Sequence, residues 1–490
     1  MDLDHDVCYC ALKHRDARFD GRFFVGVKTT GVYCRPICPA RTPYSKNVTF
    51  YLTAAAAQEA GFRPCLRCRP ETAPDMGAWR RTSQTVSRAL GLIEHGALDH
   101  GNVEQLSGRL GVGERQLRRL FREHLGASPI AVAQTRRILL AKQLIHESRL
   151  TMTDIAFASG FSSIRRFNET FLALFGRAPT DIRRRGGPEV AAASEGEFSL
   201  FLRYQPPYDW PAMLDFLLHR MIPGIESVAD GCYSRTIELD GVHGSVAVSP
   251  AVGNALCARI CFRRLSLLPI IIARLRRVFD LAADPRSISA HLAKDATLAP
   301  LIAKRPGLRV PGAWDGFELA IRSVLGQQIS VAAAVRLAGR LVAAHGVRIA
   351  SADRTLTHLF PQPRVLAKAD LTGLGLPRSR AATLSAVAAA AVADSDLFGA
   401  TRSLEETVHR LRAIGGIGEW TAQYIALRQL REPDAFPAAD IGLTRALTDR
   451  QGRRPSVGEL LSRAEQWRPW RAYAAQHLWA SAEKLDVVRS

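Results

Sequence analysis

Four cysteines stand in two close pairs, and this spacing constrains the N-terminal part of the chain more than any other feature. Three residues separate Cys34 from Cys38, two separate Cys65 from Cys68, and 26 lie between the pairs. Two such pairs suit four thiolates arranged tetrahedrally around Zn²⁺. Two disulfides or four unrelated buried cysteines are the alternatives, and a reducing cytosol argues against the disulfides. We therefore predict a zinc site, and we expect the unmatched pair Cys8 and Cys10 to be ordinary thiols.

The charge of the chain predicts a polyanionic partner. The 490 residues carry a net charge of +20, and residues 80–187 hold eighteen Arg or Lys against nine Asp or Glu. No apolar run approaches the roughly 20 residues of a membrane span, and the start MDLDHDVCYC has no signal-peptide pattern. We expect a cytoplasmic, nucleoid-associated protein that binds double-stranded DNA and no membrane.

Two changes of composition divide the chain into modules. Residues 70–77 (PETAPDMG) and 186–197 (GGPEVAAASEGE) are small or polar and are predicted linkers. They separate a cysteine module at 1–78 from an arginine-rich helical module at 79–187 and a large C-terminal module. That last module opens with the strand-like runs SLFLRYQ, SRTIELD and GSVAVSP and becomes helical after about Trp314. A multidomain α+β protein is predicted.

The cysteine module resembles a known DNA-repair domain. The pieces TTGVYCRPICPAR, NVTFY and AGFRPCLRCRP occur in the order found in the methylphosphotriester-accepting domain of Ada proteins. This resemblance covers residues 5–75 and implies that Cys34 accepts the methyl group while Cys38, Cys65 and Cys68 complete the zinc shell. Methylation of one thiolate would change the formal charge of the zinc site from −2 to −1. The site would then repel DNA phosphates less, so DNA binding would strengthen. Arg35 either holds a phosphate or is merely solvated.

Two helix-turn-helix patterns follow. In residues 102–126, four apolar side chains form one face of the second helix and four arginines lie mostly on the other, namely Leu117, Leu120, Phe121 and Leu125 against Arg115, Arg118, Arg119 and Arg122. In residues 153–184, a phenylalanine face opposes outward polar residues, namely Phe161, Phe167, Phe171 and Phe175 against Arg165, Arg166 and Asn168. Small hairpins with solvated arginines are the alternative. The second pattern resembles the AraC family, which implies that these side chains contact DNA.

The segment LRAIGGIGEWTAQYIALR (411–428) places a glycine hairpin between two amphipathic helices. Glycines such as Gly416 and Gly418 let backbone N–H groups approach a DNA phosphate. Together with the downstream EPDAFPAADIGLTRAL, the layout resembles helix-hairpin-helix glycosylases of the AlkA 3-methyladenine type over residues 197–485. The resemblance implies an α+β subdomain at 197–300 and an α-helical glycosylase domain at 301–490.

The same resemblance assigns roles to individual residues. Asp440 matches the catalytic aspartate, which would stabilise an oxocarbenium-like sugar after the base leaves the duplex stack. Trp420, Tyr424 and Trp479 are either the faces of a base pocket or ordinary core aromatics. Gln328 stands where some relatives place a leucine wedge. Lyase-competent relatives have lysine at the position of Trp420, and no cysteine follows Cys261, so neither a Schiff base nor a C-terminal iron–sulfur cluster is predicted.

The combined hypothesis is a DNA-alkylation repair protein that also regulates transcription. A zinc thiolate would take methyl groups once from DNA phosphotriesters, and a monofunctional glycosylase would excise alkylated purines. No PCHR motif occurs, so repair of O6-methylguanine is not predicted. We expect an activator that works as a monomer with RNA polymerase as a further partner. The alternative is a DNA-binding regulator with a structural zinc and a non-catalytic damage-binding module.

Overall fold

The computed structural model describes residues 3–16, 19–73, 83–94, 96–99, 101–148, 150–183, 197–351, 353–394, 396–399, 404–449 and 451–487. Most of the two expected linkers, 70–77 and 186–197, lies outside these residues. The chain forms two compact units: Met1–Gln205 with Ala251–Ala273, and Pro206–Pro250 with Arg274–Ser490. The multidomain α+β class is confirmed. Throughout the described ranges, every helix is too short or too polar to cross a membrane.

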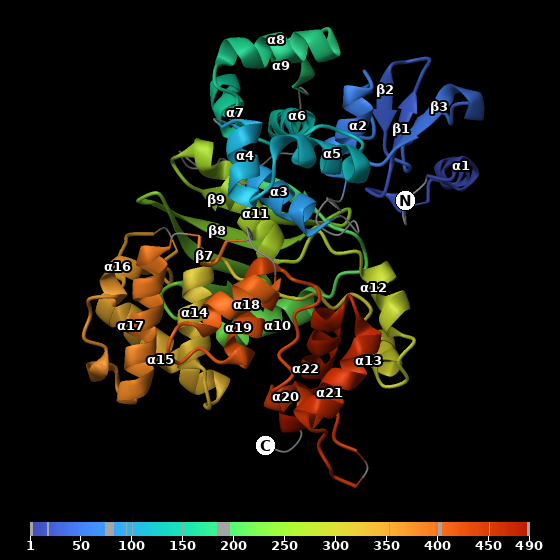
Figure 1. Ribbon diagram of the computed structural model, residues 1–490. Coiled ribbons are helices and arrows are strands. Elements are labelled where there is room, and N and C mark those ends of the chain that lie inside the picture. Colours follow the sequence, from blue (N-terminus) through green and yellow to red (C-terminus); the bar gives the residue numbers. More distant parts are fainter. Residues whose placement is uncertain are drawn as a thin grey trace. The chain divides into compact units, whose positions relative to one another are not determined.

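The N-terminal part of the first unit is a small sheet with two helices (Figure 1). Its strand order is β3-β1-β2-β4, with β1 antiparallel to β2 and β3, and β2 parallel to β4. The sheet brings the ends of β2 and β4 together, and each of these strands leads into one cysteine pair. The elements are α1 (His5–Lys13), β1 (Phe24–Val27), β2 (Val32–Cys34), β3 (Val48–Tyr51), α2 (Ala54–Glu59) and β4 (Arg63–Pro64).

Two helix-turn-helix units follow in the first unit, as predicted. Asn102 caps the first helix of the first helix-turn-helix unit, α4 (Val103–Leu110), through a capping box with Gln105, and Gly111 ends this helix in a left-handed conformation. The expected apolar faces are confirmed: Leu117, Phe121, Phe167 and Phe171 are fully buried. The helices are α3 (Gln84–Glu94), α4 (Val103–Leu110), α5 (Glu114–Leu125), α6 (Pro129–Glu147), α7 (Met152–Ala158), α8 (Ile164–Phe175) and α9 (Pro179–Ile182).

The cysteine module, called the zinc module from here on, and the arginine-rich helical module pack against each other within the first unit. Glu59, at the end of α2, accepts from Arg122 at 2.7 and 3.0 Å and from the hydroxyl of Ser128 at 3.0 Å. Lys142 of α6 is fully buried and donates to Glu71 at 2.6 Å and to the carbonyl oxygen of Cys65 at 3.1 Å. The carbonyl group of a predicted zinc ligand therefore contacts a helix of the DNA-binding module.

The first unit also contains β5 (Glu197–Arg203) and β9 (Ala255–Cys261), which pair antiparallel over seven residues each. Helix α11 (Leu268–Val278) begins in the first unit and ends in the second. The expected boundaries at 78, 187 and 300 remain predictions, because these compact units follow packing and divide the residues differently.

The second unit starts from three antiparallel strands, of which β7 pairs with β6 and β8. The strands are β6 (Glu226–Ala229), β7 (Cys232–Leu239), β8 (Val242–Ala251) and the short pair β10 (Val347–Arg348) and β11 (His358–Leu359). The two strand-like runs predicted at SRTIELD and GSVAVSP lie in β7 and β8.

Helices make up most of the second unit, as predicted beyond Trp314 (Figure 1). Buried side chains fill every turn of α14, which packs against α15, α17 and α19. The helices are α10 (Trp210–Arg220), α12 (Pro285–Leu292), α13 (Leu298–Lys304), α14 (Gly316–Leu325), α15 (Val331–His345), α16 (Pro363–Leu366), α17 (Arg378–Ala393), α18 (Leu404–Arg412), α19 (Glu419–Ile425), the π-helix Ala426–Leu430, α20 (Ile441–Ala446), α21 (Val457–Ala464) and α22 (Arg471–Val487).

Candidate metal centre and active site

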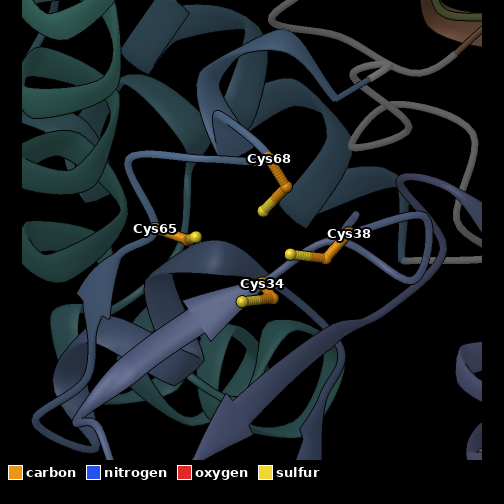
Figure 2. A group of neighbouring side chains, drawn as sticks. All are labelled: Cys34, Cys38, Cys65 and Cys68. Carbon is orange, nitrogen blue, oxygen red and sulfur yellow. The ribbon is translucent and has the colours of Figure 1, made fainter. Parts of the chain in front are cut away.

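The four predicted ligands converge at one end of the small sheet (Figure 2). Cys34 is the last residue of β2, and Cys65 follows β4, with its N–H donating to the carbonyl of Tyr33 at 3.0 Å. The four sulfur atoms lie within 4.8 Å of one another, and all four residues are buried free cysteines. The geometry is a four-thiolate cluster, and the two disulfides considered from the sequence are not formed.

The donor set fits Zn²⁺. Backbone N–H groups of Arg35 and Arg67 donate to the sulfurs of Cys68 and Cys65, at 3.3 and 3.4 Å. Contact with Cys38 and the other two sulfurs, followed by burial, raises the pKa of the Cys34 thiol. Four thiolates at this spacing therefore need a cation between them, and four-sulfur tetrahedral coordination is typical of zinc. Burial and then Asp4 raise the pKa of Cys8 to about 11, so this thiol outside the cluster stays protonated.

Arg35 is turned toward the protein. Its Nε donates to Asp20 at 2.8 Å, its Nη2 also pairs with Asp20, and its Nη1 donates to the carbonyl of Cys68 at 3.3 Å. Arg35 therefore stabilises the loop that contains Cys68. A phosphate contact by Arg35 remains a prediction, and it would require this pair with Asp20 to open.

The arginines of the first predicted DNA-contacting helix, α5, differ in their partners. Arg115 and Arg119 are exposed, Arg118 pairs with Glu114 of the same helix at 2.6 Å, and Arg122 pairs with Glu59. In α8, all three predicted contact residues are exposed: Arg165, Arg166 and Asn168. Both helices thus present a polar face, and the contact of that face with DNA remains a proposal.

A cavity of about 1310 Å³ in the second unit holds Asp440. Asp440 caps α20, and its carboxylate accepts the backbone N–H of Leu443 at 3.1 Å. The indole N–H groups of Trp420 and Trp479 donate to its two oxygens, each at 2.8 Å. Three donors converge on one carboxylate and fix its orientation.

The three predicted pocket aromatics lie together in this cavity. Trp420 stacks on Tyr424 with ring centroids 5.3 Å apart, and Tyr424 meets Trp479 edge to face at 6.2 Å. Burial alone would raise the pKa of Tyr424, but the charges of Arg428 and Arg220 outweigh it and lower that pKa. The aromatics surround the aspartate, so they are not remote core residues.

Two glycines, Gly442 and Gly416, stand where neighbouring groups leave no room for a side chain. A side chain at Gly442 would place its Cβ 2.9 Å from Asp440 and 3.1 Å from Trp479. Gly416, in the hairpin between α18 and α19, has φ +88°, and a Cβ there would lie 2.0 Å from the hydroxyl of Thr383. Gly418 is the N-cap of α19.

The hairpin is tied to the loop that carries Gln328. The neighbouring Gln327 donates to the carbonyl of Gly416 and to the hydroxyl of Thr421, both at 3.1 Å, and its own carbonyl accepts from Arg380 at 2.7 Å. Gln328 itself is exposed, with a left-handed backbone at φ +58°. Sequence reasoning missed Gln327, Gly442 and Arg428, because each also contacts a residue far along the chain: Gly416 for Gln327, and Trp479 for the other two.

Four family models match: the metal binding domain of Ada at residues 7–71, a helix-turn-helix domain at 106–185, the AlkA N-terminal domain at 199–315, and the HhH-GPD superfamily of base excision DNA repair proteins at 321–472. The zinc centre, the DNA-binding helices and the glycosylase fold define a multidomain DNA-repair protein that contains a transcription-factor domain.

Two relatives and one solved structure narrow this class. The chain is 42% identical over 487 residues to a probable bifunctional transcriptional activator/DNA repair enzyme AlkA of Mycobacterium tuberculosis, covering 99% of this chain and 97% of that protein. It is 34% identical to DNA-3-methyladenine glycosylase 2 of Escherichia coli, over 57% of this chain and 95% of the relative. The chain belongs to the family of bifunctional transcriptional activator/DNA repair enzymes. A 3-methyladenine DNA-glycosylase from Archaeoglobus fulgidus shares the fold, with TM-score 0.52 and 22% identity over 58% of this chain and 98% of its own.

Proposed function

We propose that one chain performs two repair reactions and reports one of them to the transcription machinery. Zinc-held Cys34 accepts a methyl group from DNA methylphosphotriesters, and the Asp440 site hydrolyses the N-glycosidic bond of alkylated purines of the 3-methyladenine and 7-methylguanine type. The observation that carries the proposal is the pair of built sites: a buried four-thiolate cluster and a carboxylate held by two indole N–H groups.

Cys34 is the proposed nucleophile. Its thiolate attacks the methyl carbon, an S–C bond forms, the C–O bond breaks, and the phosphodiester leaves with the electron pair. When bound, zinc keeps the four sulfurs ionised at neutral pH. Backbone N–H groups donate to the sulfurs of Cys65, Cys68 and, through Ala40, Cys38. Among the described residues, Cys34 is therefore the ligand whose sulfur receives the fewest donors, and its electron pairs are the most available.

The resulting thioether is stable, so each molecule reacts once. Loss of one negative charge at the cluster reduces repulsion of the DNA phosphates and strengthens DNA binding by the arginine faces of α5 and α8. The exposed Arg115, Arg119, Arg165, Arg166 and Asn168 are the proposed contacts with promoter DNA. RNA polymerase is the proposed further partner, and two helix-turn-helix units in one chain support action as a monomer.

Methyl transfer is tested by mass. The zinc-loaded protein is incubated with duplex DNA bearing methylphosphotriesters, followed by intact mass and peptide mapping. One added methyl group at Cys34 is expected, and it should persist in Cys10→Ala, which removes an exposed thiol outside the cluster. Methylation that persists in Cys34→Ala, at another cysteine, would overturn the assignment.

Asp440 is the proposed catalytic residue of the glycosylase site. Its charge stabilises the positive sugar as the base leaves, and water then adds at C1′ and gives up a proton. Trp420, Tyr424 and Trp479 form the proposed pocket for the extruded base, Gln328 the wedge that enters the vacated stack, and the N–H groups near Gly416 and Gly418 the phosphate contact. Support comes from their common cavity and from the exposed, strained backbone of Gln328.

The glycosylase assignment is tested by single-turnover excision. Asp440→Asn keeps the size of the side chain but removes its charge, and we expect loss of at least about a hundredfold in the rate of 3-methyladenine release. Asp434→Asn would be a poor control, because the partly buried Asp434 pairs with Arg468 and Arg471. Asp370→Asn, in an exposed loop, is the matched control. Excision by Asp440→Asn at the wild-type rate would overturn the assignment.

A further inference from the structure

A buried guanidinium group lies behind the aromatic walls of the glycosylase pocket. Trp420, Tyr424 and Arg428 follow one another at intervals of four residues along α19 and the π-helix Ala426–Leu430. The Arg428 guanidinium carbon lies 5.1 Å from the ring centre of Tyr424 and 5.3 Å from that of Trp479. It also lies over the ring of Phe216, at 4.5 Å from the ring centre.

Arg428 is held rigidly in this place. The residue is 3% exposed, it lines the cavity, and its Nη1 donates to the carbonyl of Pro311 at 2.9 Å. An arginine keeps its charge at any physiological pH, and water screens a buried charge poorly. Together with Arg220, this charge lowers the pKa of the Tyr424 phenol against the effect of burial.

Cleavage of an N-glycosidic bond moves negative charge toward such a cation. The electron pair of the breaking bond goes to the base, so a cationic base leaves neutral and a neutral base leaves as an anion. The sugar becomes positive, water adds to C1′, and a proton is released. A fixed cation behind the base favours the movement of the electron pair onto the base, whether the base starts as a cation or neutral. Before cleavage, however, the fixed cation repels only the cationic base.

We infer that Arg428 is a specificity-determining residue, whose charge behind Tyr424 and Trp479 favours excision of uncharged damaged purines relative to cationic ones. It acts through the rings and the field of the pocket and does not touch the reacting atoms. This inference rests on the proposed function of the Asp440 site.

The test compares two bases in the full-length protein. Single-turnover excision is measured over a range of enzyme concentrations on duplexes containing 7-methylguanine, a cation, or hypoxanthine, a neutral base. In Arg428→Gln, the hypoxanthine rate should fall about tenfold with an unchanged half-saturating concentration, as expected for loss of one charge near the leaving group. The half-saturating concentration for 7-methylguanine should fall, so selectivity for the cationic base rises about tenfold. Arg428→Lys, which keeps the charge, should retain the wild-type selectivity within about twofold.

The outcomes separate this inference from the proposed function. If wild-type protein excises both bases and Arg428→Gln changes both rates and both half-saturating concentrations by equal factors, the inference is overturned and the Asp440 site stands. If wild-type protein excises neither base, the proposed function fails and the inference with it. Thermal unfolding verifies the fold of each variant, and Arg428→Met provides a second neutral variant if Arg428→Gln does not fold.

Discussion

The carboxylate of Glu59 holds the guanidinium group of Arg122 at 2.7 and 3.0 Å, joining the zinc module to the first predicted DNA-contacting helix. The guanidinium is more than half exposed, so the pair is accessible to solvent. The contact has a consequence for DNA binding, because Arg122 cannot bind Glu59 and a phosphate in the same geometry. We therefore expect Glu59 to compete with DNA for Arg122, one of the four arginines of α5.

Glu59→Gln should strengthen binding of unmethylated protein to DNA. The freed Arg122 would add about one phosphate contact, raising affinity several-fold at low salt and steepening the dependence of log K on log salt by about one unit. Fluorescence anisotropy over a series of salt concentrations measures both. Glu104→Gln, on the exposed side of α4, removes the same charge without releasing an arginine. Equal effects of the two substitutions would contradict the competition.

Lys142→Met should destabilise the first unit. Lys142 and Glu71 form a fully buried pair, so removal of the lysine takes away one of the two cationic partners of Glu71, leaving Arg69 at 3.1 Å, and removes the donor to the carbonyl of Cys65. Breaking such a pair costs about 3–5 kcal/mol. Urea unfolding followed by a probe in this unit should show a loss of that size, and Lys13→Met, in the exposed last turn of α1, should show almost none. A loss below about 1 kcal/mol would show that the pair does not hold the modules together.

Removal of zinc should separate the two activities. A strong chelator takes away the ion that neutralises four clustered thiolates, so methyl acceptance is lost and the zinc module loosens. Asp440 and its aromatic neighbours lie in the other compact unit. The rate of base excision, measured at saturating protein, should therefore stay within about twofold of its starting value. Parallel loss of both activities would show that the glycosylase depends on the metal centre.

His477 should make the second unit sensitive to acid. Burial and then Arg305 lower the pKa of this imidazole to about 4, from an ordinary value of 6.5. The unfolded chain thus binds a proton that the folded chain rejects, so stability is full above pH 6.5 and falls as the pH drops toward 4. The loss approaches about 3 kcal/mol. In His477→Gln, the free energy of unfolding measured in urea should no longer fall by this amount between pH 6.5 and 4. His219 is exposed, so His219→Gln should retain the fall.

The sequence predicted those features that depend on local pattern. The cysteine spacing predicted the ligand set, and the apolar faces around Phe121 and Phe171 predicted two helix-turn-helix units because a helical period of 3.6 is visible in a short window. The glycines at 415–418 likewise predicted the hairpin, since few other residues allow that turn.

The remaining contacts join residues that no local pattern connects. Trp479 lies 39 residues from Asp440 in the chain, and Gln327 lies 89 residues from Gly416. Their meeting depends on how helices pack, and no period or spacing encodes it. Arg35 shows the same limit: an arginine beside a predicted methyl acceptor suggests a phosphate contact, but Asp20 binds its guanidinium group.

The most direct test of two reactions in one chain uses a single alkylated duplex that carries methylphosphotriesters and 3-methyladenine. Wild-type protein, Cys34→Ala and Asp440→Asn are each incubated with it, and both the methyl content of the protein and the free bases released are measured. We expect that Cys34→Ala releases bases but gains no methyl group, and that Asp440→Asn gains one methyl group but releases no bases above background. Loss of both activities in either folded variant, or retention of both, would contradict it.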